Sequence, residues 1–234
     1  MPERLNGLKI LHISDIHGNS PDKMNLDIWP AIEALDFDLA VITGDMIISD
    51  LDQIKPHLPS IYRLSRRAPV FYVEGNHEMM LFEEMSDLLR NAGVTVLANE
   101  RQVWKIGKYG PVSIIGLRDY NVLLINRLAD LARLLSANDG KFHLILSHEP
   151  QVFEQMKRMK LGLALTGHTH GGQVRIPAFP TLYAPGQGFL PEYGDGWYCE
   201  GYNKMYVSRG IGVTLFPVRM FNRPEIAVIE CVRG

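Results

Sequence analysis

Leu8-Lys-Ile-Leu-His-Ile-Ser-Asp-Ile-His17 is an apolar run that leads into an aspartate and a histidine two positions apart. Leu8–Ile13 has the short, nearly continuous apolar character of a strand buried on both faces. The polar residues then lie in the loop that leaves the carboxyl end of this strand. Because side chains two positions apart on an extended segment point the same way, Asp15 and His17 can grip one metal ion.

Four further apolar runs lead into polar motifs in the same way. They are Asp38–Thr43 before Gly44-Asp45, Pro69–Val73 before Gly75-Asn76-His77-Glu78, Phe142–Leu146 before Ser147-His148, and Leu161–Leu165 before Gly167-His168-Thr169-His170. Together the motifs offer carboxylate, imidazole and amide donors, the mixture that borderline divalent cations accept. The ordered set predicts a two-metal site, with Mn, Fe and Zn all compatible with this mixed ligation.

Helical patterns lie between the apolar runs. Glu78–Ala92 carries apolar residues at helical spacing, and Leu124, Leu128, Leu131 and Leu135 form a second such stripe. Leu51–Leu64 is also apolar at helical spacing, but Pro56 and Pro59 are expected to break or kink it. Alternating strands and helices indicate an α/β fold, in which ligands bind at the carboxyl ends of parallel strands.

The remaining segments indicate additional strands and one long loop. Val94–Leu97, Val103–Ile106 and Val112–Gly116 are strand-like without a helix between them, so we expect an antiparallel portion or a second sheet. The Gly-, Pro- and aromatic-rich segment Gly171–Gly201 is expected to be a structured loop. Strand patterns resume at Lys204–Ser208 and Glu225–Val232.

The composition is that of one ordinary globular domain, expected to span residues 1–234. Apolar residues make up 46% and charged residues 21%, which excludes a disordered or fibrous chain. The formal net charge of −2 argues against a general nucleic-acid binder. No apolar stretch is long enough for a signal peptide or a membrane span, so the sequence predicts a soluble, cytoplasmic protein, with peripheral membrane contact left open.

A pair of metal ions about 3.5 to 4 Å apart needs a bridging carboxylate. Asp45 is the best candidate, since it follows a central strand and Gly44, whose missing side chain lets backbones approach closely. His168 and His170 share the spacing of the first motif, and each could serve a different ion. Taken singly, these motifs also fit purely structural interpretations, such as a helix-capping aspartate, a turn capped by Asn76, or a polar turn.

The order of the motifs resembles the calcineurin-like metallophosphoesterase superfamily over nearly the whole chain. The resemblance implies a layered sandwich of mixed β-sheets flanked by helices, with the metal site at the carboxyl ends of the strands. It also implies a first metal bound by Asp15, His17 and His170, a second bound by Asn76, His148 and His168, and Asp45 as the bridge. In this pattern His77 is not a ligand; it contacts the phosphate and protonates the leaving oxygen, while a metal-bridging hydroxide attacks phosphorus.

A finer resemblance involves Gly167–Val174, Tyr206–Gly212 and Arg223–Ile226. These segments are similar to a bacterial branch that includes phosphodiesterases and hydrolases of UDP-diacylglucosamine. The resemblance favours phosphodiesters or pyrophosphates, with nucleotide-linked and lipid-linked substrates both open. Many members of that branch carry an N-terminal membrane or export segment, but here the first strand follows almost at once, so we do not expect membrane anchoring.

One position departs from the superfamily pattern. Many members carry an acidic residue three positions after the bridging aspartate, where it orients the general-acid histidine, but here Ile48 occupies that position and Asp50 is shifted. His77 is therefore expected either to be oriented by another group or to contribute less.

Two further features have alternative interpretations. Arg209 is expected to join Asn76 and His77 in substrate binding, or else to form a buried structural salt bridge. The aromatic stretch Phe179–Tyr193 is expected to pack over the core, or to form an apolar lip that selects a substrate with an apolar portion.

The leading hypothesis is a dinuclear metal-dependent phosphodiesterase or pyrophosphatase. The alternatives are a phosphomonoesterase or protein phosphatase of the same fold, and a metal-binding scaffold without turnover. An amidohydrolase barrel also uses a His-x-His pair, but it begins with that pair and typically needs about 250 residues.

Overall fold

The computed structural model describes residues 2–18, 28–119, 134, 142–177, 179–213 and 218–233. Its first sheet has the strand order β13-β1-β2-β3-β4. The first four strands in sequence are mutually parallel, and β13 runs antiparallel to β1 at the edge. The strands are β1 (Lys9–Ile13), β2 (Leu39–Thr43), β3 (Val70–Val73), β4 (Thr95–Val96) and β13 (Ala227–Glu230).

The second sheet has the order β11-β12-β8-β7-β6-β5. Its central strands are parallel, while β5 with β6 and β11 with β12 form antiparallel pairs at the two edges. The strands are β5 (Glu100–Ile106), β6 (Gly110–Gly116), β7 (His143–Leu146), β8 (Gly162–Thr166), β11 (Gly196–Glu200) and β12 (Asn203–Val207). Val103–Ile106 and Val112–Gly116 thus form the expected antiparallel portion in a second sheet, whereas Val94–Leu97 contributes β4, a parallel strand of the first sheet.

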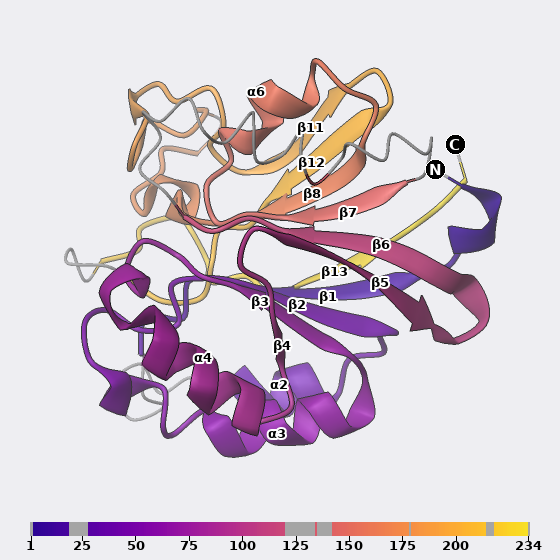
Figure 1. Cartoon of the computed structure of the whole chain (residues 1–234). Helices are drawn as coiled ribbons and strands as arrows, with labels where there is room; N and C mark the ends of the chain where they lie inside the picture. The colour runs from indigo at the N-terminus through magenta and orange to yellow at the C-terminus, as the bar shows by residue number, and fades with distance from the viewer. Residues whose placement is uncertain are drawn as a thin grey trace.

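The two sheets face one another and share an apolar core (Figure 1). Successive residues of the central strands point alternately into this core and into an outer one. In β2, Leu39 and Val41 join the core between the sheets, whereas Ala40 and Ile42 pack toward the helices. Both faces of these strands are buried, which explains their nearly continuous apolar sequence.

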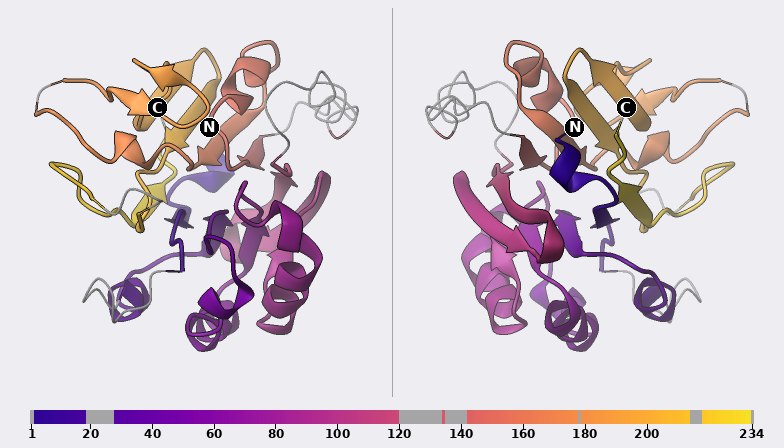
Figure 2. Two further views of the ribbon diagram at one scale, coloured as in Figure 1. Left: turned by 90° about the vertical axis from the view of Figure 1, so that its left-hand side faces the viewer. Right: turned by 90° about the vertical axis from the view of Figure 1, so that its right-hand side faces the viewer.

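Helices cover the outer face of each sheet, which makes four layers (Figures 1 and 2). The helices α2 (Ile28–Glu33), α3 (Leu58–Arg67) and α4 (Phe82–Asn91) pack on the first sheet. The short α6 (Val152–Met156) packs on the second. The α/β sandwich expected from the sequence is confirmed.

Two of the three predicted helical segments contain a helix, with different bounds: α4 covers Phe82–Asn91 of the expected Glu78–Ala92, and α3 begins within the expected Leu51–Leu64. Leu51–Gln53 forms a 3-10 turn, and α3 starts only at Leu58, so the proline-containing segment does break the helix. Pro59 lies in the first turn of α3, where its missing N–H costs nothing. The stripe Leu124, Leu128, Leu131 and Leu135 lies outside the described residues.

The segment expected to be a loop, Gly171–Gly201, contains secondary structure. The residues β9 (Tyr183–Ala184) and β10 (Gly188–Phe189) form a small hairpin, and β11 completes the second sheet. Within the described ranges, no helix is both long and apolar enough to cross a bilayer.

Candidate metal centre

The five motif loops meet at one end of the sandwich. The loop after β1 bonds to the loop after β2, because the Asp15 amide donates to the Gly44 carbonyl (3.1 Å) and the His17 amide to the Asp45 carbonyl (2.9 Å). Across the two sheets, the His168 amide donates to the Asp15 carboxylate (3.1 Å). The predicted convergence is confirmed, but the strands that carry the motifs are divided between two facing sheets rather than lying in one.

Two glycines allow this close approach. A Cβ atom on Gly75 would collide with the Asp45 carboxylate, and a Cβ atom on Gly167 would collide with Ser14 and Asp15. Any larger residue at either position would push two motif loops apart.

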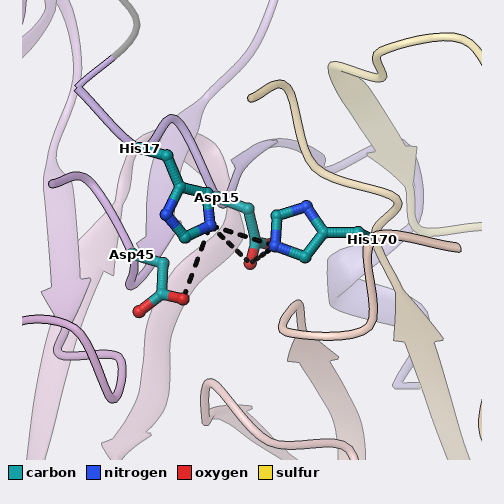
Figure 3. A group of neighbouring side chains, drawn as sticks. All are labelled: Asp15, His17, Asp45 and His170. Atoms are coloured by element: carbon teal, nitrogen blue, oxygen red, sulfur yellow. Dashed lines mark hydrogen bonds and ion pairs between the residues drawn. The ribbon is translucent and has the colours of Figure 1, made fainter. Parts of the chain in front are cut away.

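Asp15, His17, Asp45 and His170 form a first donor group, with one ligand atom from each within 4.8 Å of the others (Figure 3). The Nε2 atom of His17 lies 3.0 Å from His170 Nε2 and 3.6 Å from Asp45 Oδ2. The Nε2 atom of His170 lies 3.5 Å from Asp15 Oδ1. Two imidazole nitrogens and two carboxylates therefore point toward one small volume, which fits a divalent cation.

A second donor group consists of Asp45, His148 and His168. The Nε2 atom of His148 lies 3.2 Å from Asp45 Oδ2 and 3.1 Å from His168 Nδ1. Asp45 belongs to both groups, so one carboxylate lies between two sets of histidines.

A hydrogen bond to a backbone carbonyl outside the second donor group orients the His148 ring. His148 Nδ1 lies 2.7 Å from the Thr43 carbonyl, which can only accept, so this nitrogen carries the proton. Burial opposes a charge on this ring, but Asp45 outweighs it and holds the pKa of His148 well above its usual value, so without metal Nε2 also carries a proton, directed at Asp45. Metal binding at Nε2 would release that proton. A ring nitrogen tied to a carbonyl in this way is typical of metal-binding histidines.

Burial sets the protonation of the site. It lowers the pKa of His17 to about 4 and of His168 to about 3, so both rings are neutral near pH 7, the form that binds metals. Burial also raises the pKa of Asp15 to about 6. Burial opposes ionisation of Asp45, but His148 and His17 outweigh it and hold the pKa of that carboxyl below its usual range.

Five of these side chains sit on a left-handed backbone. The φ angles of Asp15, His17, Asp45, His168 and His170 lie between +51° and +72°. This conformation is unfavourable for residues with a Cβ atom, by roughly 1 kcal/mol or more each, and persists only where the surroundings enforce it. Such strain concentrated on the donor groups indicates a functional site.

Glu78 joins two of the motif loops. Its buried carboxylate accepts backbone N–H bonds from Asp45 (2.9 Å), Met46, Ile47 (3.2 Å) and Gly75 (2.8 Å). Burial raises the pKa of Glu78 to about 8, whereas four N–H donors favour the ionised form. The motif residue was visible in the sequence, but this role was not, because it depends on contacts with a loop 32 positions away.

His77 lies at the edge of the site. Its ring contacts that of His17 edge to face, with centroids 4.9 Å apart, and its Nε2 lies 3.9 Å from Asp45 Oδ2. The Nδ1 atom lies 2.7 Å from the Ile48 carbonyl. Ile48, which occupies the position where an orienting acid was expected, therefore supplies an acceptor for His77 from its backbone.

The two remaining expected site residues differ in their surroundings. Asn76 precedes His77 on the same turn and is exposed. Arg209 Nε lies 2.5 Å from Glu225 Oε2, and the Tyr206 hydroxyl bonds to the same carboxylate. The pair of Arg209 and Glu225 matches the alternative in which Arg209 forms a structural salt bridge. Substrate binding by Arg209 stays a prediction.

The histidines outside the motifs are buried and hydrogen-bonded. His12 Nε2 lies 2.8 Å from Thr43 Oγ1, and His143 Nδ1 lies 2.8 Å from Ser113 Oγ. His57 Nδ1 accepts from Trp29 Nε1 at 3.0 Å. These contacts give the three rings structural roles in the fold.

Comparisons with known proteins point to the same chemistry. The model of the family described as calcineurin-like phosphoesterase matches residues 8–172. The chain is 30% identical over 237 residues to the uncharacterized metallophosphoesterase YkuE of Bacillus subtilis, a match that covers 97% of this chain and 80% of that protein. It is also 30% identical over 234 residues to the phosphodiesterase YaeI of Escherichia coli, covering 96% and 82%.

A solved structure shares the architecture. The protein TT1561 of Thermus thermophilus superposes with a TM-score of 0.54 at 14% identity, over 86% of this chain and 89% of that one. At this identity the likeness concerns the fold alone.

Proposed function

Because the chain belongs to the calcineurin-like phosphoesterase family, and is thus a phosphoester hydrolase, we propose that it uses two divalent metal ions to hydrolyse phosphodiesters or pyrophosphates. The observation that carries this proposal is the position of Asp45, which is shared between two donor groups. A carboxylate in that position can bridge two ions, the arrangement of two-metal phosphoesterases.

The donor atoms divide naturally between two ions. Asp15, His17 and His170 would hold the first ion, His148 and His168 the second with Asn76 completing it, and Asp45 would bridge them. When bound, the ions would lower the pKa of a water molecule and neutralise charge on the phosphoryl group. Mn, Fe and Zn all suit this mixed nitrogen and oxygen ligation.

His77 is proposed to donate a proton to the leaving oxygen. With Nδ1 bonded to the Ile48 carbonyl, the ring presents Nε2 toward Asp45 and thus toward the reacting group. Proton donation by a positioned histidine typically contributes about 10²–10⁴-fold to the rate.

The test begins with protein stripped of metal by a chelator. Mn, Fe, Zn and Ni are then restored singly, and hydrolysis of bis(p-nitrophenyl) phosphate is compared with that of p-nitrophenyl phosphate. We expect metal-dependent activity that is greater on the diester, and its loss in Asp45→Asn. The exposed Asp36→Asn is the matched control, which should keep full activity. Greater activity on the monoester would favour a phosphomonoesterase, and inactivity with every metal would favour a scaffold.

A lipid-linked substrate is a second candidate, supported by apolar surface beside the site. A pocket of about 250 Å³ is lined by His170, Val174, Tyr183 and Pro185 among others. Close to it in sequence, Phe189 is 84% exposed, and its ring packs against Tyr183. An apolar chain bound there would extend from the metal-binding loop.

Replacing Phe189 and Leu190 with Ser tests this candidate. If the lip binds an acyl chain, activity on a lipid-linked diester falls while bis(p-nitrophenyl) phosphate is hydrolysed as before. Equal losses on both substrates would reject the apolar lip.

A further inference from the structure

Arg219 lies next to the first donor group. Its Nη2 atom lies 3.4 Å from His170 Nδ1 and donates to the carbonyls of Arg209 (2.9 Å) and Gly212 (2.5 Å). Nε also donates to the Gly212 carbonyl, at 2.9 Å. The loop that carries these carbonyls is itself held to the site, because the Gly212 amide donates to the Asp15 carbonyl at 2.6 Å. The guanidinium is therefore fixed in place beside a proposed metal ligand.

Among the described residues, Arg219 makes no direct ion pair with a carboxylate, although Asp15 and Glu225 lie near enough to favour its charge. Three other partly buried arginines do have one: Arg118 pairs with Glu74 (2.6 Å), Arg175 with Asp195 (2.6 Å), and Arg209 with Glu225 (2.5 Å). Backbone carbonyls accept from Nε and Nη2 of Arg219 but do not neutralise its charge. A partly desolvated cation that makes no direct ion pair is costly, so a further anionic group in direct contact with it would be stabilising.

One end of the guanidinium is also unsatisfied. Nη1 is buried and has no hydrogen-bond partner in the part of the chain that the structure describes. Buried donors of this kind are rare and normally meet an acceptor. Although burial lowers the pKa of Arg219 to about 10, the group stays protonated near neutral pH.

The imidazole of His170 separates Arg219 from the other members of the first donor group. The Nε2 atom of this ring faces His17 and Asp15, and its Nδ1 atom faces Arg219. An anion that contacts Arg219 would thus lie on the side of the His170 ring opposite to Nε2, the atom that faces the first donor group. This position suits a second group on the same substrate better than the reacting phosphate itself.

We infer that Arg219 binds a second anionic group of the substrate, attached beyond the phosphate that is hydrolysed. The planar guanidinium fork matches phosphate and carboxylate oxygens alike. The inference rests on the proposed function, because it takes the reacting phosphate to lie at the two donor groups. It adds Arg219 to the expected substrate-binding residues Asn76, His77 and Arg209.

Calorimetric titration of Mn-loaded protein tests the inference without turnover. The ligands are methylphosphonate, with one anionic group, and phosphonoacetate and methylenediphosphonate, which add a carboxylate and a second phosphonate. We expect the wild type to bind at least one of the latter two more tightly than methylphosphonate. Arg219→Gln should lower the affinity for that ligand about tenfold and change the affinity for methylphosphonate less than twofold. The ligand with the larger loss identifies the second group.

Two further variants separate anion binding from a structural role. Arg219→Lys keeps the charge without the fork and should lie between wild type and Arg219→Gln. Arg63→Gln removes a surface charge on α3 and should leave all three affinities unchanged. Equal binding of the three ligands by the wild type would overturn the inference, as would an equal loss on all three in both Arg219 variants. Because manganese content is measured first, a chain that binds no metal contradicts the proposed function instead.

Discussion

The Nδ1 atom of His77 lies 2.7 Å from the backbone carbonyl of Ile48. Ile48 occupies the position at which many relatives of this superfamily are expected to carry an orienting acid. A carbonyl accepts from Nδ1–H as a carboxylate does, but it adds no negative charge. The orientation of His77 is thus retained although the acidic side chain is missing.

His77→Ala should reduce hydrolysis in a way that depends on the leaving group. On an alkyl phosphodiester we expect a loss of about 10²–10⁴-fold in kcat, because the alkoxide needs a proton to leave. On bis(p-nitrophenyl) phosphate, whose leaving group is stable as an anion, the loss should be far smaller. Steady-state rates on both substrates measure this, and full activity on the alkyl diester would remove His77 as the acid.

Gln53 is expected to act on catalysis through His77. Its Oε1 accepts from the Ile48 amide at 2.7 Å and from the Ser49 amide at 3.3 Å, which holds the Ile48 carbonyl in place. Gln53→Leu removes both bonds, and we expect it to lower kcat on the alkyl diester by about tenfold through the weakened bond between His77 and the Ile48 carbonyl. The rate on the aryl diester and the manganese content should not change.

Gln53→Glu keeps an acceptor oxygen and should restore most of the rate on the alkyl diester. Equal losses on both diesters in Gln53→Leu would indicate a general structural role rather than control of His77.

Elements with a strong local pattern were predictable from the sequence. The strands β1, β2, β3, β7 and β8 are buried on both faces, so their apolar runs are unambiguous. By contrast β11 is Gly196-Trp-Tyr-Cys-Glu200, with a largely exposed surface, and it is a strand because it pairs with β12. The pairing of β11 with β12 depends on the arrangement of the whole sheet, which the local sequence pattern does not reveal.

The same distinction applies to the candidate site. The donor residues could be predicted because each follows a recognisable strand, and their motifs occur in a fixed order. The roles of Glu78 and Arg219 depend instead on contacts with distant loops, and neither residue type nor spacing reveals them.

Glu78→Gln should destabilise the protein. The carboxamide replaces one acceptor oxygen by an NH₂ group, so two of the four backbone N–H donors lose their acceptor, at a cost of roughly 2 kcal/mol or more. Denaturant unfolding measures the change, with the exposed Glu83→Gln as the matched control. A stability equal to that of the control would indicate that Glu78 is held as the neutral acid.

Because His12 is buried, we expect the free energy of unfolding to decrease in acid. Burial lowers its pKa from 6.5 to about 3, so between these values the unfolded chain takes up a proton that the folded protein does not. The contribution is complete above pH 6.5 and is lost as the pH falls toward 3, by up to about 1.4 kcal/mol per pH unit. Unfolding free energies of metal-free protein between pH 7 and 4 measure the slope.

His12→Phe removes this titration and should reduce the slope by about one proton. The variant loses the bond to Thr43 Oγ1, so it should be less stable at pH 7 while depending less on pH. An unchanged slope would contradict the assignment of His12 as a buried neutral ring.

The proposed chemistry depends above all on Asp45 lying between two metal ions. Anomalous scattering from a crystal soaked in Mn²⁺ locates such ions without reference to activity. We predict two peaks about 3.5 to 4 Å apart, one beside Asp15, His17 and His170 and one beside His148 and His168, with Asp45 contacting both. A single peak, or two peaks that do not share Asp45, would contradict the two-metal arrangement.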